Sequence, residues 1–384
     1  MAADRILTTH AGSLPRPAAL RELHERRFAG ERVDEAAFAA ETKAAVADVV
    51  ARQAAAGIDI ANDGEAGRES FFTFVRERFT GFGGRSQRPP MADMVRYPGF
   101  LDILQRMYPR GGVSLGAPPQ AIGEVKHRGE GEIEAECARL KAAIAAAGDP
   151  FVGAFMTAPS PGIIAAAMQN VHYASLADYV AAVGEALAPE YRAILEAGLI
   201  LQIDAPDLAM ERHTLFAGKP LADFLDFVRL VLDAIGRALA DAPSERVRLH
   251  VCWGNYEGPH DLDVPLADIW PQISGAPVGG FLISMANPRH AHEVGCFSGG
   301  ALPAGATLVA GVIDTTTNYV EHPEVVAERL ERAVAAVGDP ARVMAGTDCG
   351  FETAAGFQSV AADVCWAKLA AMSEGARIAS GRVF

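Results

Sequence analysis

Residues 248–256 read Arg-Leu-His-Val-Cys-Trp-Gly-Asn-Tyr, an apolar run that ends in a histidine and a cysteine two positions apart. Alternate side chains of a β-strand lie on the same face, so His250 and Cys252 are expected to point into the space at the end of this strand. An imidazole beside a thiolate is half of a zinc site. The alternative is that Cys252 is a small core residue, as free cysteines commonly are, and that His250 only forms a hydrogen bond there.

A second strand-like run covers residues 342–347 and is followed by Asp348, Cys349 and Gly350. The carboxyl ends of parallel strands meet at one edge of a sheet, so a cysteine here can share a pocket with the first pair. This second run favours the metal interpretation and adds Cys349 to it.

Composition excludes several classes of function. The chain has 384 residues, 50% hydrophobic and 21% charged, which fits a soluble protein with one α/β barrel or two smaller domains. A net charge of -14 argues against nucleic acid or an anionic membrane as a partner. The first residues lack a secretory signal, and the sequence has no apolar run of bilayer length, so we expect a cytoplasmic protein. Five cysteines without a C-x-x-C pair predict free thiols, which could bind metal, and no disulfide framework.

Buried strands alternate with helices along most of the chain. This alternation predicts parallel strands, and polar residues at the ends of widely separated strands favour a closed (β/α)8 TIM barrel over an open sheet. We expect one barrel domain over residues 1–384, because no long linker or repeat is visible. No glycine-rich dinucleotide or P-loop motif occurs. The predicted strands are 6–9, 58–62, 121–126 (outside the barrel), 151–157, 199–203, 248–252, 280–284, 308–312 and 343–347.

Helical segments are expected between these strands. Residues 18–56 predict an N-terminal helical segment of two helices that is broken near Gly30. Residues 71–127 interrupt the alternation as a long excursion rich in phenylalanine. Long loops of this kind form lids or oligomer contacts, so the excursion is one reason to expect a homo-oligomer. Further helices are predicted over 132–147, up to about 198, over 221–239 and over 323–337.

Polar residues at other strand ends suggest a substrate site. After the first strand, Gly12 allows close approach of the backbone and Ser13 offers a hydroxyl group and an N–H, which together could hold a carboxylate. After the second strand comes Glu65, which we expect to bind a substrate ammonium group. The alternatives are an ordinary strand-to-helix turn at Gly12 and a solvated surface carboxylate at Glu65.

Five motifs occur in the order found in the catalytic barrel of cobalamin-independent methionine synthases. They are TTHAGS at 8–13, DGE at 63–65, QID at 202–204, HVC at 250–252 and DCG at 348–350. Along nearly its whole length the chain resembles the short, single-barrel branch of this family, which includes epoxyalkane:coenzyme M transferases. In that family zinc binds the substrate thiol and delivers it as a thiolate to an alkyl donor.

The resemblance implies a single zinc-dependent catalytic barrel and assigns its residues. The implied Zn2+ ligands, which are also the catalytic residues, are His250, Cys252 and Cys349. The implied substrate contacts are Ser13 to the carboxylate of homocysteine, Glu65 and Asp204 to its ammonium group, and Gly12 and Asn287 nearby. The function expected is a zinc-dependent thiol S-alkyltransferase, most simply methyl transfer to homocysteine. The alternatives are addition of coenzyme M to an epoxide, a metal-free lyase similar to porphyrinogen decarboxylases, and a non-catalytic binding barrel.

Two positions depart from the family. Ser284 stands where a glutamate ligand of the zinc is expected, which leaves water, Glu293 or the substrate itself for the fourth position. Residues 162–170 contain no tryptophan where the folate-using enzymes stack an aromatic residue on the pterin. We therefore expect free methyltetrahydrofolate to be a poor donor compared with a small electrophile or a methyl-carrying partner protein. Phe72 and Phe74 are the expected walls of the donor site.

Overall fold

A parallel β-sheet lies at the centre of the computed structural model, which describes residues 4–107, 113, 115–129 and 131–384. Residues 108–112 and 114 of the predicted excursion lie outside the described residues. Seven strands pair in the order β1-β4-β5-β6-β7-β8-β9. Their bounds are β1 Ile60–Ala61, β4 Gly153–Pro159, β5 Ile200–Asp204, β6 Val247–Val251, β7 Gly280–Ile283, β8 Thr307–Ile313 and β9 Val343–Thr347.

Residues 6–9 lie between the first and last strands of this sheet. On one side the N–H of Ala345 donates to the Leu7 carbonyl at 2.8 Å and that of Thr9 donates to the Ala345 carbonyl at 2.9 Å. On the other side the N–H groups of Asp59 and Ile60 donate to the Thr8 carbonyl at 3.1 and 3.0 Å. The segment therefore acts as an eighth strand, and the predicted (β/α)8 barrel is confirmed.

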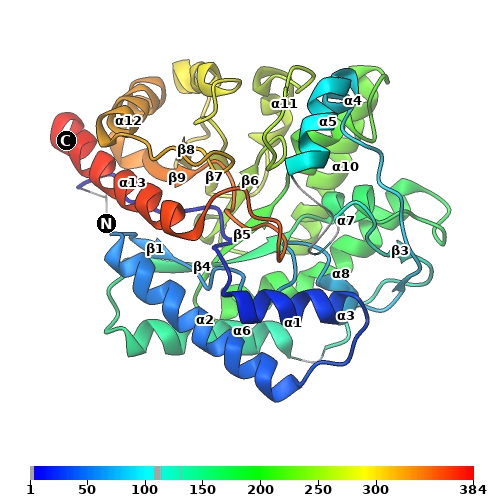
Figure 1. The fold of residues 1–384 in the computed structure, drawn as a ribbon. Coiled ribbons are helices and arrows are strands. Elements are labelled where there is room, and N and C mark those ends of the chain that lie inside the picture. The colour runs from blue at the N-terminus through cyan, green and yellow to red at the C-terminus, as the bar shows by residue number, and fades with distance from the viewer. Residues whose placement is uncertain (1–3, 108–112, 114, 130) are drawn as a thin grey trace.

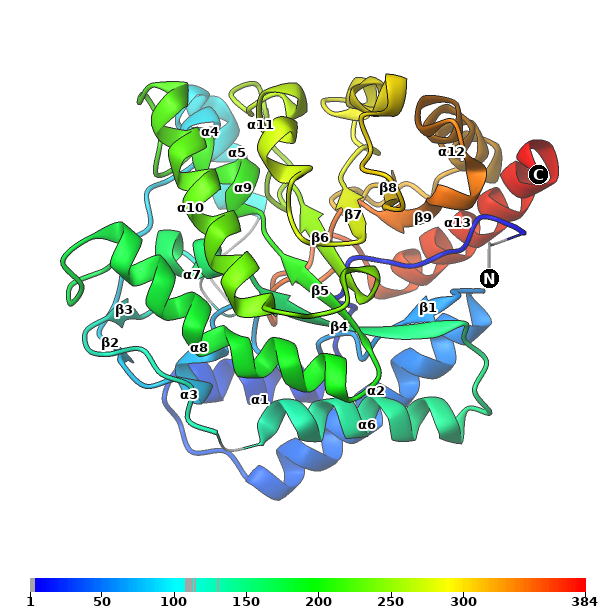
Figure 2. The ribbon, with the colours of Figure 1, turned by 180° about the vertical axis from the view of Figure 1, so that it is seen from behind.

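Helices cover the outside of the barrel (Figures 1 and 2). The first two, α1 (Ala18–Phe28) and α2 (Glu35–Ala55), confirm the N-terminal helical segment and its break near Gly30. The others are α6 Glu132–Ala146, α8 Leu176–Glu196, α10 Leu221–Leu239, α11 Leu266–Ile273, α12 Pro323–Val337 and α13 Ala362–Val383. In the part of the chain that the structure describes, no helix has the length and apolar character needed to cross a membrane.

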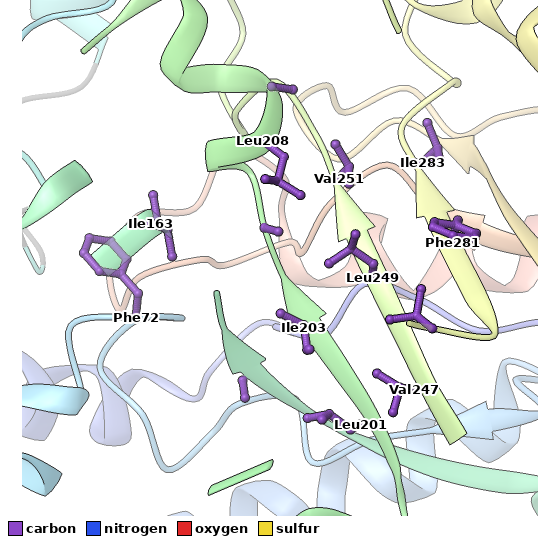
Figure 3. Packing of buried hydrophobic residues seen from close by; sticks show 14 of the residues in the cluster. Phe72, Ile163, Leu201, Ile203, Leu208, Val247, Leu249, Val251, Phe281 and Ile283 are labelled. Atoms are coloured by element: carbon purple, nitrogen blue, oxygen red, sulfur yellow. The ribbon is translucent and has the colours of Figure 1, made fainter. Parts of the chain in front are cut away.

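Side chains of the central strands alternate between two environments, as a pleated strand requires. On β6, Val247, Leu249 and Val251 pack in the main hydrophobic core between sheet and helices (Figure 3). The intervening Arg248 and His250 lie on the other face, inside the barrel, where polar hydrogen bonds replace apolar packing. The period of two thus places His250 on the inner face of the barrel.

The excursion over residues 71–127 is confirmed as a segment outside the barrel. It contains α3 (Val75–Arg78), β2 (Phe82–Gly83), α4 (Ala92–Arg96), α5 (Pro98–Met107) and β3 (Gln120–Ala121). The predicted strand over 121–126 is shorter than expected: β3 pairs antiparallel with β2, apart from the barrel sheet, and Ala121 forms one bridge with Asn170. In both views α4 and α5 lie beside α10 and α11, at one end of the barrel.

Candidate functional site

A cavity of about 910 Å³ opens where the carboxyl ends of several barrel strands meet the excursion. This end of the barrel is where (β/α)8 enzymes carry their active sites. Its deep wall includes Ser13, Glu65, Asp204, His250, Cys252 and Cys349, which are six of the residues selected from the sequence. The excursion supplies most of its apolar wall, with Phe71, Pro89, Pro90, Met91, Met94, Val95, Leu101, Val113 and Leu115.

The histidine and the two cysteines come together in this wall. The side-chain donor atoms of His250, Cys252 and Cys349 all lie within 4.8 Å of one another. His250 and Cys252 are 3% and 4% exposed, while Cys349 is 9% exposed and lies closest to solvent. One imidazole nitrogen and two sulfur atoms at this separation are a donor set that suits zinc and leaves a further position free.

Hydrogen bonds orient these three side chains. The Nδ1 atom of His250 lies 3.0 Å from a carboxylate oxygen of Asp204. Burial opposes protonation of the ring, but the bonds to Asp204 and Cys252 outweigh it and raise the pKa of His250 to about 10. A hydrogen bond from Cys349 holds the pKa of Cys252 well below its ordinary value. Cys252 is therefore the first of the two cysteines to become a thiolate.

Glu65 presents an unpaired carboxylate oxygen to the site. Its Oε1 atom accepts a hydrogen bond of 3.0 Å from Thr157, whereas Oε2 is buried and makes no hydrogen bond. Burial and the neighbouring Asp204 raise the pKa of Glu65 to about 7. The backbone φ of Glu65 is +56°, a left-handed conformation that is unusual for this residue type. A cationic group of a ligand would satisfy both the open oxygen and the charge.

The turn after the first strand packs against this glutamate. Gly12 has φ of +139°, and a Cβ atom there would lie 2.5 Å from Oε1 of Glu65, so only glycine fits. Ser13 is buried and lines the cavity beside Gly350, where a Cβ atom would lie 2.0 Å from the Ser13 hydroxyl oxygen. The predicted close approach of backbone at Gly12 therefore brings the first, second and last strand ends together.

The loop after β7 is held by a carboxylate. The N–H groups of Met285, Ala286 and Asn287 donate to the side chain of Asp348 at 2.8 to 3.0 Å. Asn287 thus lies against Asp348, with its amide 3.3 Å from the same carboxylate. Ser284 donates its hydroxyl hydrogen to the Asp348 carbonyl at 2.5 Å.

Glu293 is occupied elsewhere. Its carboxylate accepts a bond of 2.7 Å from the N–H of Leu266 and lies 2.9 Å from Nδ1 of His290. Glu293 thus bonds away from the three donor atoms, whereas Ser284 lies beside them, because Nε2 of His250 is 3.2 Å from the same Asp348 carbonyl. Of the candidates for the fourth position, water and the substrate remain.

A polar layer beneath the site fixes Asp204. Gln202 donates to Asp204 at 2.7 Å and also to the Ala11 carbonyl, while Arg248 donates to Gln202 at 2.8 Å. Burial lowers the pKa of Arg248 to about 9. Because the members of this chain point inward from β5 and β6, the carboxylate that orients His250 is itself held in place.

The expectation that Phe72 and Phe74 form the donor wall is wrong. Residues 162–167 lie in helix α7 (Pro161–Ala167), which is buried throughout, and they are not among the described residues that line the cavity. Phe72 is fully buried near Ile163 (Figure 3), and the ring of Phe74 stacks under the guanidinium groups of Arg68 and Arg78. Phe71 lines the cavity instead.

Several cavity residues were missed by the sequence analysis. Asn255 and Tyr256 line the cavity immediately after Cys252, within the same quoted stretch, and their position next to a strand end was a usable signal. Asn255 donates to the Gly350 carbonyl at 2.8 Å, which ties the loops of the two cysteines. Met210 and Thr214 also line the cavity, but nothing in their local sequence indicates this.

Comparison with known proteins identifies similar sequences. The family described as cobalamin-independent synthase, catalytic domain, matches residues 6–89. A methionine synthase of Saccharolobus solfataricus is 24% identical over 374 residues, which cover 97% of this chain and 94% of the relative. A methionine synthase of Sulfolobus acidocaldarius is 23% identical over 346 residues, covering 90% of this chain and 85% of that protein.

A solved structure shares the fold. The B12-independent methionine synthase from Shewanella sp. W3-18-1, in complex with selenomethionine, superposes with a TM-score of 0.75 at 21% identity and covers 98% of both chains. The match of the family and the alignment of these relatives along nearly the whole chain confirm the resemblance to the cobalamin-independent methionine synthase family.

Proposed function

We propose that the protein is a zinc-dependent thiol S-alkyltransferase that transfers a methyl group to homocysteine, and that residues 1–384 form one catalytic barrel. The observation that carries the proposal is the convergence of His250, Cys252 and Cys349 in one cavity wall with Glu65 and Asp204. The relatives named methionine synthase support the same reaction. The five cysteines are free thiols, which suits a cytoplasmic enzyme.

The residues present fit a zinc ion. His250, Cys252 and Cys349 would hold it, and Asp204 on the far nitrogen of His250 is the carboxylate partner that zinc-binding histidines commonly have. Two thiolates and a neutral imidazole balance the charge of the ion. When bound, zinc lowers the pKa of the substrate thiol, so that the thiolate nucleophile forms at neutral pH. Because Glu293 bonds elsewhere and Ser284 offers only a neutral hydroxyl, the fourth position would take the substrate sulfur, in place of water.

The charges around the site favour homocysteine over coenzyme M. The open oxygen of Glu65 can accept a hydrogen bond from an ammonium group, and the Ser13 hydroxyl lines the same cavity. A sulfonate would need free cations, but Arg16 donates to backbone carbonyls of Glu352 and Glu65. Arg68 forms a buried pair with Glu136. The carboxylates of Glu65 and Asp204 would repel a sulfonate beside the thiol, while the arginines that line the cavity, Arg85 and Arg88, belong to the excursion.

The size of the cavity bears on the identity of the methyl donor. A cavity of about 910 Å³ admits a small electrophile as well as a pterin. We retain the expectation that a small donor, or a methyl group carried by a partner protein, serves better than free methyltetrahydrofolate. Parallel assays with homocysteine and methyltetrahydrofolate, methylcobalamin or a short epoxide test this. Faster thiol loss with the free folate would refute the expectation.

The decisive experiment is metal analysis combined with thiol consumption. Protein purified without chelators should carry one zinc at this site, and Cys252→Ser or Cys349→Ser should lose that zinc and the activity together. Cys296→Ser removes a half-buried thiol away from the cluster and should change neither. Full thiol consumption in metal-free protein would refute the role of zinc, whereas metal-free protein that consumes no thiol would leave the lyase. Absence of both zinc and activity would favour a binding barrel.

A further inference from the structure

A second cluster of metal-binding residue types lies outside the cavity wall described above. Donor atoms of His260, Asp263 and His290 lie within 4.8 Å of one another. His213 adds a fourth side chain, with Nδ1 3.0 Å from the Oδ1 atom of Asp263. The four residues come from three successive connections of the barrel, because His213 ends the 3₁₀ helix η1 (Glu211–His213) after β5, His260 and Asp263 follow β6, and His290 follows β7.

Neutral histidines in this cluster would have too few N–H groups for the acceptor oxygens around them. His260 has Asp263 at 2.8 Å from Nδ1 and the Tyr256 carbonyl at 3.0 Å from Nε2. His290 has Asp263 at 2.8 Å from Nε2 and Glu293 at 2.9 Å from Nδ1. Carbonyl and carboxylate oxygens only accept hydrogen bonds, while a neutral imidazole has one N–H. Either both buried rings carry a second proton, or a cation replaces the protons that face Asp263.

The fourth side chain gives an independent reason to place a cation there. Nδ1 of His213 and Oδ1 of Asp263 are both buried and make no hydrogen bond, although they lie 3.0 Å apart. The hydroxyl of Tyr256 donates to Asp93 at 2.6 Å, so its oxygen is left to accept from Nε2 of His213, 3.5 Å away. If the ring is neutral, that tautomer turns an unprotonated Nδ1 toward a carboxylate; a doubly protonated His213 would instead form an ion pair with Asp263. A nitrogen lone pair facing an anionic oxygen is stable when a cation lies between them.

We propose that His260, Asp263 and His290 bind a divalent transition-metal ion of the zinc, iron or manganese class, in addition to the site at Cys252, with His213 on the other oxygen of Asp263. Imidazole and carboxylate ligands without a thiolate suit these ions. The outer nitrogens of His260 and His290 contact a carbonyl and a carboxylate, as the far nitrogens of metal-bound histidines commonly do. Tetrahedral ligands at zinc distances lie roughly 3.3 Å apart. The present 2.8 Å contacts need to open by only about half an ångström.

The second ion would fix the loop that carries Cys252. Trp253 stacks on His290 with ring centroids 3.8 Å apart, and Trp253 directly follows Cys252 in the chain. Tyr256 in the same loop lines the cavity. The His260 side chain is 14% exposed, against 1% for Asp263, so the ion would enter past His260. The proposed ligands do not line the cavity, so the second ion would not contact the substrate. Its role would be structural, in holding the loop at the rim of the cavity.

Cobalt titration of chelator-treated protein tests the proposal. Thiolate ligands give Co2+ an intense charge-transfer absorption that nitrogen and oxygen ligands do not give. We expect two equivalents of Co2+ per chain, one with this absorption and one without it. Asp263→Asn and His260→Gln should each lose only the second equivalent, whereas Cys252→Ser should lose only the first. Glu293→Gln should weaken the second equivalent roughly 10- to 100-fold, as loss of an outer partner does.

Two results would overturn the proposal. The first is one equivalent of Co2+ in the wild type, unchanged in His260→Gln, with the absorption of a thiolate site. The second is nuclear magnetic resonance evidence that the rings of His260 and His290 stay doubly protonated while excess Co2+ or Zn2+ is present. Because the two sites give different spectra, loss of the thiolate site and loss of this site are distinguished in one titration. Thermal unfolding of each variant checks that it is folded.

Discussion

Glu65 combines three features that ordinary packing does not explain. Its backbone is left-handed, its side chain is buried, and one carboxylate oxygen has no hydrogen bond. Each feature costs stability, and strain of this kind concentrates at functional sites. The DGE motif could be selected from the sequence because it follows a strand. The unpaired oxygen could not, since it depends on Thr157 and Gly12, which come from two other strands.

Replacing Glu65 with glutamine should raise KM for homocysteine roughly tenfold to a hundredfold, because a charge-assisted hydrogen bond worth about 1.5–3 kcal/mol is lost. Bound zinc should stay unchanged, since Glu65 is outside the proposed ligand set. Steady-state kinetics with metal analysis checks both. Glu77→Gln, an exposed residue of the excursion, is the control. An unchanged KM for homocysteine would contradict the assigned contact.

The buried carboxyl of Asp207 should make the free energy of unfolding depend on pH. Burial, with nearby Glu211, raises its pKa from 3.8 to about 7, although a hydrogen bond from Ser160 opposes the shift. A carboxyl whose folded-state pKa is raised stabilises the fold fully in acid, and this contribution is lost as pH rises from about 4 through 7. Each pH unit in this window costs up to about 1.4 kcal/mol.

Asp207→Asn should therefore flatten the fall in the free energy of unfolding between pH 4 and 7. The amide can still accept the bond from Ser160. Denaturant unfolding of the zinc-loaded protein at several pH values gives the comparison. The exposed Asp233→Asn on α10 should follow the wild type. Parallel curves for wild type and Asp207→Asn would show that the pKa of this carboxyl is the same in the folded and unfolded states.

At the scale of elements, regular periodicity was predictable and irregular connections were not. The bounds of α10 and α12 match the predicted 221–239 and 323–337, because both helices carry a clear apolar stripe. By contrast, residues 161–167 are apolar all round, so their pattern did not reveal helix α7. The three phenylalanines Phe71, Phe72 and Phe74 could not be told apart in the same way. Nothing in their local sequence distinguishes them, and only packing decides which ring reaches the cavity. Helix α13 was not predicted.

The excursion is attached to the loop after β6 by one buried carboxylate. Asp93, at the start of α4, accepts from the Tyr256 hydroxyl at 2.6 Å and from the His260 N–H at 2.9 Å. Its other oxygen accepts from the N–H of Met94 at 2.8 Å. Because Met91 and Met94 line the cavity, the position of α4 sets the shape of the apolar wall.

Asp93→Ala should release α4 and α5 from the barrel. Two donors, on Tyr256 and His260, lose their partner, at about 1–3 kcal/mol for each buried group left unsatisfied. Hydrogen exchange of the α4 and α5 amides should accelerate while exchange in the barrel strands stays slow. Asp102→Ala, at an exposed position of α5, should exchange as the wild type does. Equal protection in Asp93→Ala and wild type would mean that apolar packing and the bonds of Arg96 and Tyr97 to Asp261 hold the excursion without Asp93.

At the scale of the whole molecule, the barrel depends on the seam made by residues 6–9. Asp59 supports this seam, because it accepts from the Thr8 N–H at 2.9 Å and from the Arg5 guanidinium at 2.8 and 2.6 Å. The closed architecture was predictable from the number and spacing of polar strand ends. The contribution of Asp59 could not be predicted, because an aspartate at the start of a strand is usually a surface residue.

Asp59→Ala should lower the free energy of unfolding by about 1–3 kcal/mol, because it leaves the buried Thr8 N–H without a partner. The matched control is Asp48→Ala, which breaks an exposed pair with Arg52 and should cost at most about 0.5 kcal/mol. Equilibrium denaturation of both variants measures the difference. Equal losses would show that the carboxylate does not hold the seam.

The same seam has a consequence for the nascent chain. Thr8 can meet Ile60 early in synthesis, but its other neighbour, Ala345, is made last among the strands. At roughly 5–20 residues per second, the ribosome needs on the order of 15–70 s to reach it. Throughout that interval the first strand exposes an unpaired backbone edge, which can pair with other chains. We therefore expect the first strand to be the part of the barrel that is most exposed to pairing with other chains during synthesis.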